Sequence, residues 1–278
     1  MDRLLYVAMS GANQLMMRQT TNNHNLANIN TVGFRADFDT FVSEDFGENQ
    51  MATRVYAIRK GGAVSNKAGD VFTTGRELDI AVDNEGFIAL QDDDGSEAYT
   101  RGGQLTIGPG GVLETKSGYG VLGDGGPIAI PPHELIQIGK DGSVSIKPPG
   151  DTTGTMLQID RIKLVTIDNA FISKGTNGLL KKTIMPAFDN PEAKDAGQAN
   201  NQDAPNNIEP QQQANAAGPE EADGTVTVTA GALESSNVNA VDALVNMITL
   251  ARQYEIQMKL MKSAEDNEAT STQLLKLT

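Results

Sequence analysis

The sequence contains no cysteine and no tryptophan, and only 5% of its 278 residues are aromatic. Without cysteine the chain has no disulfide, no thiolate nucleophile and no cysteine-ligated metal site. This suits a reducing cytosol, and equally a chain that crosses compartments unfolded and must avoid mispairing. Few aromatic residues beside 29 glycines are unusual for a compact enzyme and typical of a turn-rich β protein with an aliphatic core.

Long apolar runs and positive charge are also scarce. No apolar run approaches the roughly 20 residues that a membrane-spanning helix needs, so no membrane insertion is expected. The chain has 22 Lys and Arg against 36 Asp and Glu, a net charge of −14, which repels nucleic acid and anionic membrane surfaces. Residues 1–17 lack the unbroken apolar segment and small-residue cleavage site of a secretory signal, so a mature helix without a cleaved signal peptide is predicted.

The two ends of the chain share one pattern. Residues 3–28 and 237–275 place small and apolar side chains at three-four spacing, which predicts two long amphipathic helices. We expect the N-terminal helix in residues 1–33. The C-terminal helix is expected in residues 237–278, with Ser235, Ser236 or Asn237 as its N-cap. Matched ends of this kind favour termini that meet in one helical unit, and an assembly rather than a catalytic pocket.

The segment between the helices carries short alternating runs bounded by Gly and Asp, for example residues 78–82, 86–90 and 135–138. This pattern predicts an α+β fold whose central domain, residues 76–186, is mainly antiparallel β and sandwich- or barrel-like. Residues 34–75 are expected to form an extended linker segment. Residues 225–236 are expected to form a return strand and linker.

Residues 187–224 differ in composition from the rest of the chain. They have almost no large apolar side chains and are dense in Asn, Gln, Ala, Pro and acids. Eight acids and one lysine give this segment a charge of −7, half of the chain's −14. Such a segment cannot bury enough surface to offset the entropy lost on ordering, so a disordered acidic insert is predicted.

Three motifs resemble those of one protein family. Residues 22–35, NNHNLANINTVGFR, resemble the N-L-A-N-x-x-T-x-G-F-[KR] signature of the bacterial flagellar rod and hook family. The family's C-terminal block is resembled by residues 231–238, GALESSNV, with Met247-Ile248 and the later RQYE. Its central β segment is resembled by residues 74–87 and 95–103. One departure is the sequence that follows S-N-V, where the family often has an acid-Met pair and this chain has Asp242-Ala243-Leu244.

The resemblance implies a structural subunit of the flagellar basal-body rod. Its terminal helices would pair as a coiled coil and polymerise into a helical tube that transmits torque across the periplasm. Implied partners are other copies of the chain, neighbouring rod proteins and, during secretion, the flagellar type III export apparatus. No enzymatic activity, cofactor or metal site is implied.

Residues 1–9 and the modest chain length are most similar to proximal rod subunits. Distal rod and hook subunits of the same family are the alternatives. A secreted self-associating adhesin or binding module is the alternative of another class.

The resemblance places the expected assembly interface on the apolar stripes of both helices and on the motifs beside them. Its expected residues are Leu4, Leu5, Ala8, Met9, Gly11, Ala12, Leu15, Met16, Asn25, Leu26, Ala27, Asn28, Thr31, Gly33, Phe34, Ser236, Asn237, Val238, Val241, Leu244, Ile248, Ala251, Tyr254, Met258 and Met261. Asn25 and Asn28 are expected to bond backbone groups where the first helix ends. Gly33 is expected to permit a chain reversal before Phe34.

Four other features favour structural roles over chemical ones. The acids of residues 92–97 lack the spacing of an EF-hand loop, so a hairpin tip of solvated carboxylates is expected rather than a calcium site. The two histidines, His24 and His133, have no nucleophile motif beside them, so no catalytic triad is predicted. The glycine clusters at 108–111 and 123–126 lack a following Lys-Ser/Thr and are expected to be turns.

The fourth feature is a scatter of basic residues. They are expected to be separate solvated charges, with a patch for an acidic neighbour or peptidoglycan as the alternative. These residues are Arg59, Lys60, Arg76, Arg101, Lys181 and Lys182.

Overall fold

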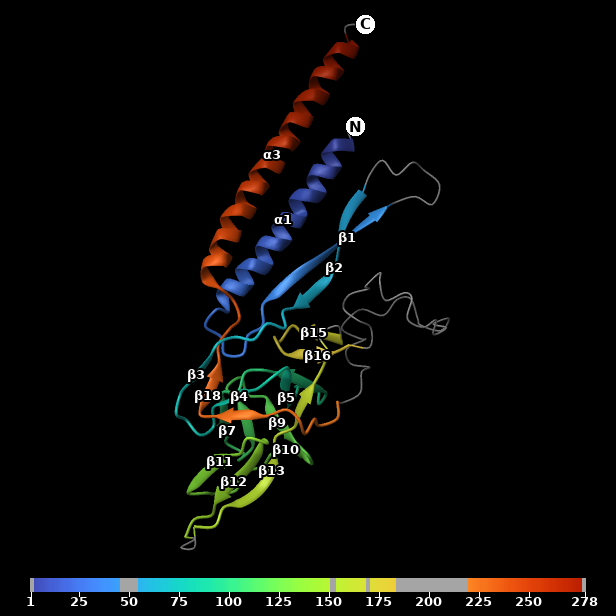
Figure 1. Cartoon of the computed structure of the whole chain (residues 1–278). Helices are drawn as coiled ribbons and strands as arrows, with labels where there is room; N and C mark the ends of the chain where they lie inside the picture. The colour runs from blue at the N-terminus through green and yellow to red at the C-terminus, as the bar shows by residue number, and fades with distance from the viewer. Residues whose placement is uncertain (1–2, 46–54, 151–153, 169–170, 184–219, 277–278) are drawn as a thin grey trace, which may run out of the picture. The chain divides into compact units, whose positions relative to one another are not determined.

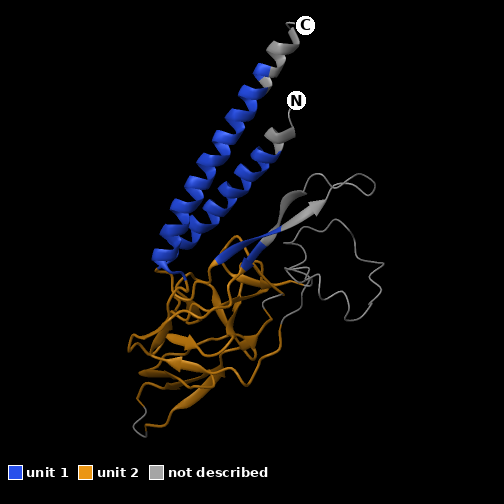
Figure 2. Ribbon diagram, turned by 45° about the horizontal axis from the view of Figure 1, so that its top comes forward, with its two compact units in different colours: residues 1–29, 37–63, 238–278 blue, residues 30–36, 64–237 orange. Residues whose placement is uncertain are grey.

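The computed structural model describes residues 3–45, 55–150, 154–168, 171–183 and 220–276 (Figure 1). The chain divides into two compact units, which Figure 2 distinguishes by colour. Unit 1 comprises residues 1–29, 37–63 and 238–278, and unit 2 comprises residues 30–36 and 64–237. The predicted acidic insert lies outside the described residues except for its last five, 220–224.

Unit 1 contains two long helices and a two-stranded sheet. Helix α1 spans Arg3–Ala27 and helix α3 spans Ala240–Lys276. Strand β1 (Asp37–Asp45) pairs with β2 (Val55–Val64). These strands lie in the segment where an extended linker is expected. Neither helix is long and apolar enough to cross a membrane, within the residues that the structure describes.

The predicted start of the C-terminal helix is wrong by a few residues. Helix α3 begins at Ala240, not beside Ser235, Ser236 or Asn237. Asn239 is its N-cap, because the Asn239 side-chain Oδ1 accepts a hydrogen bond from the Val241 backbone N–H at 2.9 Å. A side-chain oxygen at this position satisfies one of the free N–H groups of the first turn.

Helices α1 and α3 pack against each other, and each contributes one seam of small, polar and apolar side chains. Their partly or fully buried positions alternate between four and three residues apart, which is the spacing of a heptad. On α1 the seam is Ala8, Ala12, Leu15, Gln19, Asn22 and Leu26, and on α3 it is Ala243, Met247, Leu250, Tyr254, Gln257, Met261 and Ala264.

Two contacts fix an antiparallel pairing of the helices. Asn22 Nδ2 donates to the Ala243 carbonyl at 2.8 Å. Towards the other end of α1, a Cβ added to Gly11 would lie 3.3 Å from the Gln257 side chain. The absence of a side chain at Gly11 leaves room for the Gln257 side chain against α1.

Unit 2 is an arrangement of short antiparallel strands. Its largest sheet has nine strands, in the order β15-β16-β6-β5-β9-β8-β7 with β14 paired to β5 and β10 paired to β9. The three-stranded sheet is β11-β12-β13, and two-stranded sheets join β17 to β4 and β18 to β3. The strands span Val71–Thr73 (β3), Ile80–Val82 (β4), Gly86–Gln91 (β5), Glu97–Thr100 (β6), Leu105–Ile107 (β7), Leu113–Thr115 (β8), Gly120–Gly123 (β9), Gly126–Pro127 (β10), Leu135–Ile138 (β11), Ser143–Lys147 (β12), Leu157–Arg161 (β13), Leu164–Thr166 (β14), Ile172–Lys174 (β15), Leu180–Lys182 (β16), Val228–Ala230 (β17) and Ala232–Glu234 (β18).

The α+β class and the antiparallel β domain are confirmed, whereas the residues that the structure describes form no closed barrel. Among the described residues the nine-stranded sheet is open, with β15 and β7 at its ends. Strand β5 is central, because Ile88 and Leu90 pack into one aliphatic core while Phe87 and Ala89 pack into a second core on its other face. A strand buried on both faces reads as a continuous apolar run.

Candidate assembly surfaces and the motif cluster

The three sequence motifs converge on one buried carboxylate in unit 2. Glu234, from the GALESSNV motif, is 1% exposed. Its Oε1 accepts from Arg35 Nη2 at 3.0 Å, and its Oε2 accepts from Arg101 Nε at 2.7 Å. Arg35 ends the N-terminal motif and Arg101 belongs to the central one. We call Arg35, Arg101 and Glu234 the charge cluster.

The two arginines of the charge cluster are almost completely buried, at 4% and 3% exposure. Arg101 also donates to the carbonyls of Val82 (2.7 Å), Asn84 (2.8 Å) and Gly86 (2.6 Å). Burial lowers the pKa of Arg35 from its ordinary value, and the charge of Glu234 acts in the opposite direction. Removing one member of such a cluster leaves an uncompensated buried charge, which typically destabilises a protein by about 3–5 kcal/mol.

Close backbone approaches surround the charge cluster. Gly33 has a φ of +67°, and a Cβ placed there would lie 2.3 Å from the Arg101 carbonyl carbon. The Gly33 N–H donates to the Glu234 carbonyl at 2.8 Å. A Cβ on Gly69 would lie 2.0 Å from the Ser235 carbonyl oxygen. Only glycine fits these two positions without a backbone shift.

Asn237 ties three segments together beside the charge cluster. Its Oδ1 accepts from the Ala36 N–H at 2.7 Å, and its Nδ2 donates to the Lys67 carbonyl at 2.8 Å. Its own N–H donates to the Phe34 carbonyl at 3.2 Å. Asn237 therefore holds these segments together through both its amide oxygen and its amide nitrogen.

The asparagines of the N-terminal motif bond backbone groups in unit 1, as predicted. Asn25 Nδ2 donates to the Asp37 carbonyl at 2.7 Å, and its Oδ1 accepts from the Asp37 N–H at 2.8 Å. Asn28 Nδ2 donates to the His24 carbonyl at the end of α1, at 2.9 Å. The His24 ring lies 2.9 Å from an Asp37 carboxylate oxygen. These contacts fix where β1 begins after α1.

The expected interface residues fall into three groups by exposure. Leu4 and Leu5 lie in the first turns of α1. The buried ones are Ala8, Ala12, Phe34 and Ser236, and the half-buried ones are Gly11, Leu15, Asn25, Leu26, Asn28, Gly33, Asn237, Val238, Ala251, Tyr254 and Met261. The exposed ones are Met9, Met16, Ala27, Thr31, Val241, Leu244, Ile248 and Met258.

Many large apolar side chains of both helices are exposed and lie outside the seams. On α3 they are 44–66% exposed, and comprise Val241, Leu244, Val245, Ile248, Ile256, Met258 and Leu260. On α1 they are Val7, Met9, Met16 and Met17. Isolated exposed apolar residues are normal, whereas here they are concentrated on two helices.

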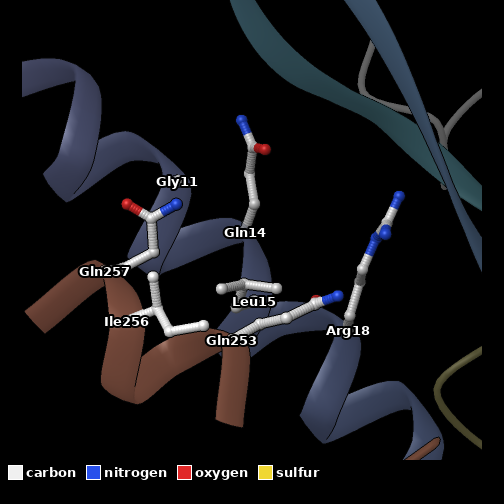
Figure 3. Close-up of a pocket in the computed structure, with 7 residues that line it drawn as sticks. All are labelled: Gly11, Gln14, Leu15, Arg18, Gln253, Ile256 and Gln257. Carbon is white, nitrogen blue, oxygen red and sulfur yellow. The ribbon is translucent and has the colours of Figure 1, made fainter. Parts of the chain in front are cut away.

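A pocket of about 270 Å³ also opens between α1 and α3. Leu15 and Ile256 contribute apolar surface to it, and the amides of Gln14, Gln253 and Gln257 make its lining mainly polar (Figure 3). A side-chain amide both donates and accepts hydrogen bonds, so these glutamines can bond either a donor or an acceptor group.

The sequence interpretation missed the charge cluster and misjudged two cations. Arg101 and Lys181 were expected to be solvated. Instead Arg101 is buried against Glu234, and Lys181 pairs with Asp92, which is itself buried. At the hairpin between β5 and β6, Asp93 and Asp94 are exposed as expected, whereas Asp92 is buried and Glu97 pairs with Lys163. The only signal available in the sequence was that Arg35, Arg101 and Glu234 each sit inside a family motif.

Comparisons with known proteins match the sequence of this chain to one class, the rod and hook subunits of flagella. Residues 229–274 match the family model "Flagellar basal body rod FlgEFG protein C-terminal". Residues 81–146 match "Flagellar hook protein FlgE/F/G D1 domain". These two segments contain Glu234 and Arg101.

Full-length relatives define the family within this class. The chain is 34% identical over 277 residues to the flagellar basal-body rod protein FlgF of Escherichia coli (strain K12) and 32% identical to FlgF of Salmonella typhimurium, with 100% of each chain covered in both cases. It is 29% identical to the rod protein FlgG of Bacillus subtilis (strain 168), with 96% of each chain covered. The chain belongs to the flagellar basal-body rod protein family, and the two FlgF proteins match it from end to end.

Proposed function

We propose that this chain is a structural subunit of the proximal rod and that it polymerises through α1 and α3 into the wall of a helical tube. The observation that carries the proposal is the outward set of large apolar side chains on both helices. The paired seams leave that set uncovered, so a coiled-coil-like pair can close within one chain and still offer apolar surface to its neighbours.

The free energy gained by covering these side chains favours contact with several neighbours over contact with one. Burying a large apolar side chain completely contributes about 1.5–3 kcal/mol. The seven outward side chains of α3 are about half exposed, so covering them adds about 1 kcal/mol each. The total is comparable to the ~4–15 kcal/mol lost in translational and rotational freedom on association. A single contact is therefore weak, whereas a subunit held by several neighbours in a tube is stable.

The remaining parts of the proposal follow from this assembly. Partners are other copies of the chain and neighbouring rod proteins, the place is the periplasmic part of the basal body, and the tube transmits torque. The function needs no turnover, no cofactor and no metal. Passage of the chain through the flagellar export apparatus fits the absence of cysteine.

Deletion of the gene tests the proposed function. We expect a non-motile strain that regains motility when the wild-type chain is supplied. Gold labelling of a tagged chain in isolated basal bodies should then mark the end of the rod near the inner membrane. A motile deletion strain would contradict the rod function, and a label only at the outer end of the rod would place the chain with distal subunits.

A further inference from the structure

The sequence crosses the boundary between unit 1 and unit 2 at four points: 29/30, 36/37, 63/64 and 237/238. The unit 2 residues at these points are the segment 30–36, Val64 and Asn237. Any force that reaches unit 2 along the backbone enters through these residues. Their connections inside unit 2 therefore decide how unit 2 resists that force.

Hydrogen bonds join these entry segments to one another within unit 2. The Ser65 N–H donates to the Ala36 carbonyl at 2.8 Å. Asn237 bonds Ala36, Phe34 and Lys67 through its amide and its backbone N–H. None of the three segments can be displaced alone, because each is bonded to the other two.

The charge cluster connects the same segments to the core. Arg35 donates to the carbonyls of Asn66 and Lys67 and to Glu234, and the Gly69 N–H donates to Glu234 Oε1 at 2.9 Å. Arg101 in turn donates to the carbonyls of Val82 in β4 and Gly86 in β5. Its guanidinium lies 5.9 Å from the centre of the Phe87 ring. The Arg101 bonds to Glu234, Val82 and Gly86 are buried, and the Arg35 and Gly69 bonds are partly buried, so a low local dielectric strengthens them.

We propose that this network is a mechanical clamp that shares torque among the chain connections of unit 2. The clamp comprises Phe34, Arg35, Ala36, Ser65, Asn66, Lys67, Gly69, Arg101, Glu234 and Asn237. The proposal rests on the proposed function, because only a rod subunit carries torque. An arginine fork suits the task, since one rigid group holds a carboxylate and three backbone carbonyls at once.

Hydrogen exchange on the purified full chain tests whether the clamp acts as one unit. The amides of Gly33, Ala36, Gly69 and Asn237 all donate into it. In Glu234→Gln we expect all four to exchange faster by a similar factor of about 100 to 1,000, while amides of β5 keep their wild-type rates. Acceleration at Gly69 alone would overturn the clamp, because that amide is the only one of the four that bonds the altered side chain.

The matched control is Glu134→Gln. Glu134 pairs with Lys147 at 3.2 Å in the same unit, but this ion pair is exposed. We expect no change at the four clamp amides in this variant. Arg101→Lys serves as a milder second variant if Glu234→Gln fails to fold, because it keeps the charge but cannot reach three carbonyls and the carboxylate together.

Rotation under load tests the mechanical role in complemented cells. Arg101→Lys cells should build a normal number of rods and turn small beads at wild-type speed. On large, high-load beads we expect at least a twofold higher rate of rotation stopping or filament loss than in wild-type or Glu134→Gln cells. Equal defects at every load, fewer rods, or no defect at any load would overturn the clamp. A motile deletion strain would instead overturn the proposed function itself.

Discussion

Replacing Gly33 by alanine perturbs the connection between the N-terminal motif and the charge cluster at a defined point. A non-glycine residue at a φ of +67° costs about 1–2 kcal/mol. The new Cβ would lie 2.3 Å from the carbonyl carbon of Arg101 and from the N of Gly102, so backbone must move. Such overpacking costs about 1–3 kcal/mol, and a weakened bond from Gly33 to the Glu234 carbonyl costs about 1 kcal/mol more. We expect a total loss of about 3–6 kcal/mol in the free energy of unfolding.

Gly75→Ala is the matched control for this substitution. Gly75 has a φ of +73°, and a Cβ there would meet nothing within 4 Å. It therefore reports the backbone strain alone, about 1–2 kcal/mol. Urea unfolding followed by circular dichroism suits both variants, because the chain has no tryptophan. Equal losses in Gly33→Ala and Gly75→Ala would refute the close approach on which this reasoning depends.

Substitutions at three further positions, Asn239, Ser96 and Asn25, each have an expected outcome with its own measurement. Removing the N-cap by Asn239→Ala should lower the free energy of unfolding by about 0.5–2 kcal/mol, and thermal unfolding followed by circular dichroism checks this. Contacts from Ser96 lower the pKa of Asp94 to about 2; this contribution to stability is present above about pH 4 and is lost as the pH falls towards 2. A carboxyl titration by NMR should therefore show a higher Asp94 pKa in Ser96→Ala, and an unchanged pKa would contradict the assignment. Asn25→Ala should speed hydrogen exchange at the Asp37 amide while Asn25→Asp, which keeps an acceptor, changes it less.

The terminal helices could be predicted from the sequence, and so could the buried side of α1, where Ala8, Ala12 and Leu15 of the expected stripe lie in the seam. The side that α3 buries within the chain could not be predicted. Hydrophobic periodicity selected a stripe containing Val241, Leu244 and Ile248, and all three are exposed. The seam with α1 instead uses small residues such as Ala243 and Ala264. Periodicity alone cannot separate apolar residues that pack inside the chain from apolar residues that stay exposed on it, because both recur at helical spacing.

The charge cluster could not be predicted for a different reason. An arginine is rarely buried unless it is paired, and the partner of Arg101 is 133 residues away along the chain. No local spacing links the two. The β strands were easier to predict, because alternating apolar residues and glycine turns are local signals. Whether the sheet closes into a barrel or stays open depends on which strands pair, and no local signal shows that.

The central claim, assembly through the outer faces of the helices, is tested most directly by one substitution. Ile248 is 55% exposed on α3, so Ile248→Asp should leave unfolding of the isolated chain nearly unchanged. In a deletion strain we expect this variant to be absent from isolated basal bodies and the cells to be non-motile. Asn246→Asp adds the same charge two residues away, at an exposed polar position, and should be incorporated normally. Equal incorporation of Ile248→Asp and Asn246→Asp would contradict the account.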